Sequence, residues 1–254
     1  MGNTRNRYPG RRRFLKQSAA LSAGAASLAN PAVVLGQGAS NAGKPGRLVV
    51  GAPPGGTTDT VARAVATDMA KALRQPVIVE NRSGGGGNVA ADAVARSTPD
   101  GTTLLVSFAS HTINATLYPM LPFDPVADST PISLLATSPS LLIGHPSIPA
   151  SSLAEIVALV KRLAQFPDVP AEVVKGFESN AWIGLFGPAR LPADVTERVY
   201  EAARAALAQP EVRKRFVVEA LAIVGNAPAE FARFVQEDIQ RWEKVVRYAG
   251  ASPG

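Results

Sequence analysis

Short apolar runs alternate with amphipathic stretches along the chain from about residue 45 onward. Three runs rich in branched aliphatic residues predict strands at 47–52, 77–80 and 103–107. Between the first two, apolar residues recur every four positions and predict a helix with one buried face: Val61, Val65, Met69 and Leu73. After the second run, Asn88 is expected to cap a helix that buries Val89, Ala93 and Val94. This order predicts βαβ units in an α/β fold with a largely parallel sheet.

The second half of the chain resumes the alternation after a proline-rich stretch at 114–149. Strands are predicted at 132–136, 141–143 and 180–186, and helices from 152 to about 163, from 192, from 210, and from 228 to about 248. Ser152 and Glu155 have the spacing of a capping box at the first of these helices. We interpret the proline-rich stretch as the crossing between two lobes, with residues 45–137 and 226–254 in the first lobe and 138–225 in the second.

Two glycine-rich turns, at 53–59 and 81–88, stand where a predicted strand gives way to a helix. Free backbone N–H groups and the positive end of the helix dipole face outward at such junctions and attract anions. Parallel strands present their carboxyl ends at one edge, so the end of the third strand is expected beside both turns. The candidate carboxylate-binding residues are Pro54, Gly55, Gly56, Thr57, Thr58, Asp59, Gly85, Gly86, Gly87, Asn88, Ser107, Ser110 and His111.

Simpler interpretations of these residues stay open. The glycines also suit tight turns that need a positive φ, and Asp59 at a helix start is more often a cap than an acid or base. His111 suits packing as well as a pocket, and two histidines in the whole chain are too few for a metal site. Trp182 fits a core position, and Asp238 falls in a mixed charged stretch expected to be a solvated helix face. We expect no catalytic residues, no metal and no cofactor.

Residues 1–36 have the pattern of a twin-arginine signal peptide. Arg11, Arg12 and Arg13 precede Phe14, and an Ala/Ser/Gly-rich apolar run follows; a membrane anchor is the alternative. This segment holds six basic residues and no acid, so the formal charge of +6 for the whole chain leaves the rest near zero. That balance argues against a nucleic-acid partner. The chain has no cysteine, so an oxidising compartment poses no hazard to thiols.

Five motifs occur along the chain: P-P-G-G-T-T-D at 53–59, V-E-N-R-S-G-G-G-G-N at 79–88, P-D-G-T-T-L-L at 99–105, A-W-I-G-L-F-G-P at 181–188 and P-A-E-F at 228–231. Together they resemble the motifs of a known family, the Bug periplasmic receptors of tripartite tricarboxylate transport. The resemblance implies a periplasmic-binding-protein type II-like (Venus flytrap) fold. It also implies capture of a small carboxylate in the periplasm, delivery to membrane permease components, no enzymatic activity and a monomer.

The chain departs from the family after the predicted helix at 152–163. On the order of seventy residues of the second lobe are missing relative to the usual family size, so we expect a truncated second lobe and weak binding. Two other hypotheses remain: a non-binding remnant or interaction protein, and, less favoured, a periplasmic enzyme that binds a nucleotide. The glycines at 84–87 do not match the G-x-G-x-x-G spacing of dinucleotide sites, which counts against the last of these.

Overall fold

The computed structural model describes residues 44–162 and 180–253. Six strands form one sheet in the order β2-β1-β3-β5-β4-β6. Their bounds are β1 Gly46–Val50, β2 Val77–Asn81, β3 Thr103–Phe108, β4 Ser129–Pro139, β5 Asn180–Pro188 and β6 Ala222–Ile223. The helices are α1 Thr57–Leu73, the short 3₁₀ helix η1 Gly85–Gly87, α2 Asn88–Ala95, α3 Ser110–Leu117, α4 Leu153–Arg162, α6 Ala193–Leu207, α7 Pro210–Val218 and α8 Pro228–Ala249.

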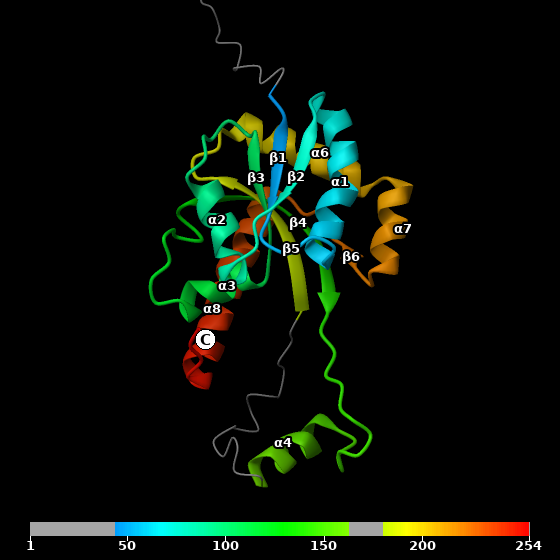
Figure 1. Cartoon of the computed structure of the whole chain (residues 1–254), viewed down its shortest axis with the longest axis vertical. Coiled ribbons are helices and arrows are strands. Elements are labelled where there is room, and N and C mark those ends of the chain that lie inside the picture. The colour runs from blue at the N-terminus through cyan, green and yellow to red at the C-terminus, as the bar shows by residue number, and fades with distance from the viewer. Residues whose placement is uncertain (1–43, 163–179, 254) are drawn as a thin grey trace, which may run out of the picture. The chain divides into compact units, whose positions relative to one another are not determined.

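Helices cover both faces of the sheet, because successive strand residues point to opposite sides. In β1, Leu48 and Val50 enter one apolar core while Val49 enters the other. The first core is completed by α1, α6 and α7, and the second by α2 and α8, as the two sides of Figure 1 show. This alternation is what fixes the sheet between two helical layers.

The helical faces agree with the predicted periodicity in most places. Val61, Val65 and Met69 are fully buried in α1, and α8 buries Phe231 and Val235. In α2 the prediction is confirmed for Val94, which is buried, and wrong for Val89, which is 52% exposed; Ala93 is half-buried, and Ala90 and Ala91 are buried. The predicted strand at 141–143 is not formed, and its three apolar residues are exposed.

The start of α2 differs from the predicted cap at Asn88. Gly56 and Gly87 occupy the N-cap positions of α1 and α2, and Thr57 and Asn88 are the first helical residues. In α4 the predicted capping box is present: the Glu155 N–H donates to Ser152 Oγ at 3.3 Å. The Glu155 side chain in turn accepts from the Ser151 N–H at 2.6 Å.

The sheet is mixed rather than largely parallel. β1 pairs in parallel with β2 and with β3, whereas β5 runs antiparallel to both β3 and β4. The prediction of parallel pairing is confirmed for β1, β2 and β3, each of which is followed by a helix. It failed for β5, which inserts between β3 and β4 from far along the chain, a pairing that local patterns do not encode.

Residues 180–223 belong to this sheet and its helical layers, whereas the sequence pattern predicts a second lobe at 138–225. The reason is that the apolar residues of β5, including Trp182 and Phe186, fill the same two cores as β1 and β3. The rest of the predicted second lobe at 138–225 stays a prediction, and residues 163–179, which follow the predicted departure from the family pattern, lie outside the described residues. Within the described ranges, no helix combines the length and the apolarity needed to cross a membrane.

Candidate functional site

The two glycine turns lie at the same edge of the sheet, after the carboxyl ends of neighbouring parallel strands. Val50 of β1 stands in register with Asn81 of β2 and Val106 of β3. The backbone packs closely here, because a Cβ placed on Gly51 would lie 3.0 Å from Gly87 Cα. The predicted convergence of the turns at one sheet edge is therefore present in the structure.

Asp59 holds the first turn in place. This side chain is 3% exposed, and its Oδ2 accepts hydrogen bonds from the Gly55 N–H and from Arg63 Nε, both at 2.9 Å. Burial alone would raise the pKa of Asp59, but these bonds and a third from Asn81 outweigh it and hold the pKa below its ordinary value. The carboxylate is thus a buried anchor of the turn and is not available to act on a ligand.

Asn81 joins the two turns. Its Nδ2 donates to Asp59 Oδ1 at 2.9 Å and to the Ala52 carbonyl at 3.0 Å, and its Oδ1 accepts from Arg63 Nη2 at 3.0 Å. One carboxamide at the end of β2 therefore fixes the start of the first turn. The sequence pattern placed Asn81 in the second turn without a role; its position as the polar end of an apolar strand was the available signal.

The second turn uses a run of four glycines, Gly84 to Gly87, all with positive φ. The carbonyls of Gly85 and Gly86 each accept from Asn114 Nδ2 at 3.3 Å, and the Gly86 carbonyl also accepts from Ser110 Oγ at 2.5 Å. Because the C=O and N–H of one trans peptide point in opposite directions, the Gly86 N–H points away from Asn114. Gly85 and Gly86 are exposed, so this donor side faces outward.

Three helices begin at this edge with their first-turn N–H groups uncapped by side chains. The N-cap residues are Gly56 for α1, Gly87 for α2 and Ala109 for α3, and none makes a side-chain cap hydrogen bond. The first N–H groups of a helix have no partner within the helix and carry the positive end of its dipole. Among the described residues, these helix starts offer backbone N–H donors at one edge, an arrangement that suits a carboxylate or a phosphate.

The predicted site residues separate by exposure. Exposed at the edge are Pro54, Gly55, Gly56, Thr57, Gly85 and Gly86, and half-buried are Asn88 and Ser110. Buried are Thr58, Asp59, Gly87, Ser107 and His111. Asn114 was missed by the sequence analysis, although it is 3% exposed and holds the second turn, because nothing in the local pattern distinguishes it from any other helical asparagine.

His111 packs in the second core rather than facing the edge. Its ring lies 4.7 Å from that of Phe186 and 6.1 Å from that of Phe123, and its Nε2 is 3.3 Å from the Pro125 carbonyl. Burial lowers the pKa of His111 to about 4, and the Pro125 contact opposes this only in part. The imidazole is neutral near pH 7. Of the two interpretations of His111, a pocket residue or a packed residue, the contacts support the packed one.

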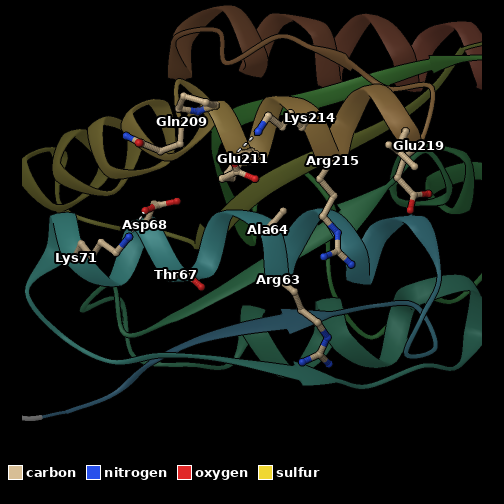
Figure 2. Close-up of a pocket in the computed structure, with 13 residues that line it drawn as sticks. Arg63, Ala64, Thr67, Asp68, Lys71, Gln209, Glu211, Lys214, Arg215 and Glu219 are labelled. Carbon is tan, nitrogen blue, oxygen red and sulfur yellow. Dashed lines mark hydrogen bonds and ion pairs between the residues drawn. The ribbon is translucent and has the colours of Figure 1, made fainter.

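A separate groove of about 800 Å³ lies between α1 and α7 and contains none of the predicted site residues. Figure 2 shows its charged lining, where Lys71 pairs with Asp68 and Lys214 with Glu211, each within its own helix. These pairs leave the groove without a concentrated charge of either sign. Among the described residues, no three His, Cys, Asp or Glu side chains gather where they could hold a metal ion.

Comparison with known proteins gives a family match. A family model described as "Tripartite tricarboxylate transporter family receptor" matches residues 61–162 and 159–251. The "UPF0065 protein in the TAR-I ttuE-ttuC' intergenic region" of Agrobacterium vitis is 26% identical over 292 residues, covering 81% of this chain and 84% of the relative. BugT of Bordetella pertussis is 38% identical over 120 residues, covering 46% of this chain and 37% of BugT.

Solved structures agree on the fold. The periplasmic binding protein BugD superposes with a TM-score of 0.69 at 22% identity, covering 82% of this chain and 98% of BugD. MatC (Rpa3494) from Rhodopseudomonas palustris with bound malate superposes with a TM-score of 0.68 at 28% identity, covering 80% and 99% of the two chains. The predicted periplasmic-binding-protein fold is confirmed.

Proposed function

Since this chain belongs to the family of tripartite tricarboxylate transporter receptors, we propose that it is a periplasmic solute-binding receptor for a small carboxylate. One carboxylate group of the ligand is held by backbone N–H groups of the two glycine turns. The observation that carries the proposal is the pair of uncapped helix starts, Gly56 and Gly87, at one sheet edge. Asn81 and Asn114 fix the two turns before any ligand arrives.

The ligand class is a dicarboxylate or a related small acid. Two similar solved structures support this, MatC with bound malate and R. palustris Rpa4515 with adipate. A backbone cradle recognises the charge and shape of one carboxylate and leaves the rest of the ligand to other contacts. The cradle therefore sets the chemical class, and contacts elsewhere set the individual ligand.

Binding is weakened because part of the second lobe is missing. The 292 aligned positions of the A. vitis relative include 81% of this chain's 254 residues, or about 206, so about 86 positions have no counterpart here. The two stretches matched by the family model meet at 159–162, which supports a deletion at that point. Helix starts contribute about 0.3–1 kcal/mol each, and millimolar affinity needs about 4 kcal/mol.

The receptor delivers its ligand to membrane permease components, uses no cofactor and catalyses no reaction. Export follows the twin-arginine pathway through the segment at 1–36. The family match supports the transporter partnership, and the R-R-x-F-L-K pattern at 11–16 supports the export route.

An interaction protein that binds no solute is the second candidate. It is favoured by Leu141 and Ile143, which lie in the predicted second lobe and are 82% and 87% exposed. Elution ahead of a monomer on size exclusion, with no change of melting temperature on addition of carboxylates, would favour this candidate.

Isothermal titration calorimetry of the purified chain with malate, adipate and citrate tests the receptor proposal. We expect binding of one or more acids with a dissociation constant in the range of about 0.1–10 mM. A micromolar constant would show that the shortened second lobe does not weaken binding. Absence of heat for all three acids at tens of millimolar would contradict the receptor role.

A further inference from the structure

Asp238 stands apart from its neighbours on α8. Its side chain is 1% exposed, whereas Glu237 beside it is exposed. The sequence pattern predicts a solvated position for Asp238, and this prediction is wrong. A buried carboxylate is costly unless donors surround it, so its partners indicate why it is there.

Three donors from three elements meet at this carboxylate. Oδ2 accepts from Thr112 Oγ1 of α3 at 2.6 Å and from Trp182 Nε1 of β5 at 3.0 Å. Oδ1 pairs with Arg241 one turn along α8. The Thr112 hydroxyl is also 2.8 Å from the Ala109 carbonyl, so its single proton is shared between the backbone and Asp238.

Thr112 lies between the two α3 residues that hold the second glycine turn. Ser110, two positions before it, and Asn114, two positions after it, bond the carbonyls of Gly85 and Gly86. Asn114 Nδ2 also donates to Asn88 Oδ1 at 2.9 Å, at the first residue of α2. A shift of the start of α3 would therefore move every one of these contacts together.

We propose that Asp238 is a positioning residue that fixes the second glycine turn through Thr112 and the start of α3. The inference rests on the proposed function, because that turn is the one that would hold the carboxylate. Four successive glycines have more backbone freedom to lose than any other residues. An external anchor removes this freedom before ligand arrives, which lowers the entropic cost of binding.

Amide hydrogen exchange by NMR tests, without any ligand, whether Asp238 fixes the second turn through Thr112. The Gly87 N–H, bonded to the Gly84 carbonyl at 3.0 Å, reports on the second turn, and the Gly55 N–H, bonded to Asp59, reports on the first. Thr112→Val removes the hydroxyl while keeping the shape, and Thr112→Ser keeps the hydroxyl. We expect Gly87 exchange to be about five to ten times faster in Thr112→Val, Gly55 exchange unchanged, and normal exchange restored in Thr112→Ser.

Asp238→Asn is expected to change Gly87 exchange in the same direction, and Glu237→Gln on the exposed face of the same helix is the matched control. Unchanged Gly87 exchange in Thr112→Val, or equal acceleration at Gly55 and Gly87, would overturn the proposal. Malate titration of the same samples distinguishes the receptor function from the anchoring of the second turn by Asp238. If the wild-type amide signals of both turns do not shift when malate is added, the receptor function is contradicted. The anchoring role is still decided by the exchange rates.

Discussion

Individual polar side chains, rather than the glycines themselves, determine the shape of the proposed site. Asp59 and Asn81 join the first turn to β2, and Asn114 holds the second turn to α3. Each is half-buried or buried, and each bonds a backbone group at or beside a turn. A glycine turn of this kind is rigid only because side chains elsewhere in the fold bond to it.

Removal of the Asp59 carboxylate should loosen the first turn. In Asp59→Ala the Gly55 N–H loses its acceptor and Asn81 Nδ2 keeps only the Ala52 carbonyl, and we expect the free energy of unfolding to fall by about 2 kcal/mol. Urea denaturation measures this loss. Asp68→Ala on the same helix breaks only a surface pair with Lys71 and should cost less than about 0.5 kcal/mol. Equal losses in the two variants would contradict the anchoring role.

His111 should make the stability of the protein depend on pH between about 6.5 and 4. The folded-state pKa is depressed, so the unfolded chain binds the proton first as pH falls below its ordinary value of 6.5. Stability is complete above pH 6.5 and declines by about 3 kcal/mol by pH 4. His111→Phe, packed against Phe123 and Phe186, should remove most of that decline in denaturation curves taken across this range. An identical pH profile in both proteins would refute the assignment.

Gly86→Ala should weaken carboxylate binding more than stability alone explains. The backbone there has φ +63, and an added Cβ would meet Asn114 Nδ2 at 3.0 Å. Gly250→Ala is the matched control, because Gly250 has a similar φ of +58 at the end of α8 with open space around it. Each variant should lose about 1 kcal/mol of stability, but only Gly86→Ala should lose malate binding in calorimetry. Comparable malate binding in the two variants would locate the ligand elsewhere.

At the scale of the element, α7 ends in a motif that favours glycine but contains alanine. The Leu221 N–H bonds the Phe216 carbonyl at 2.8 Å and the Ala220 N–H bonds the Val217 carbonyl at 3.1 Å, with Ala220 at φ +52. This is the Schellman arrangement, in which the left-handed position is usually glycine.

Ala220→Gly should therefore stabilise the protein by about 0.5–1 kcal/mol, since glycine adopts a left-handed conformation without a Cβ penalty. Thermal denaturation would detect this as a higher melting temperature. The control is Ala232→Gly inside α8, where glycine is unfavourable; this variant should destabilise the protein by about 1 kcal/mol. A lower melting temperature in Ala220→Gly would show that the strain is absent.

Helices and strands in which apolar residues recur with a regular period could be predicted from the sequence. Which elements pack or pair with one another could not. The four-residue repeat of α1 and the capping box of α4 are local signals, and both appear in the structure. The place of β5 between β3 and β4 depends on pairing across about 75 residues, where local propensity has no influence. Asn114 and Asp238 were missed for the same reason, because their partners are distant in sequence.

At the scale of the whole molecule, one mixed sheet brings the two turns to a common edge. We propose that a shortened second lobe limits what that edge can hold. The glycine motifs predicted the edge because parallel strands end together. The closure of a second lobe over it had no local signal beyond chain length and family resemblance. Capture of a small ligand usually buries about 70–90% of its surface, which one sheet edge does not provide.

The central claim is that backbone N–H groups of both turns hold a single carboxylate. It is tested most directly by titrating malate into the ¹⁵N-labelled chain and following backbone amide shifts. The account predicts that Gly56 and Thr57 of the first turn, with Gly86 and Asn88 of the second, shift along one binding curve with a millimolar constant. Shifts confined to one turn, or found only along the groove between α1 and α7, would contradict it.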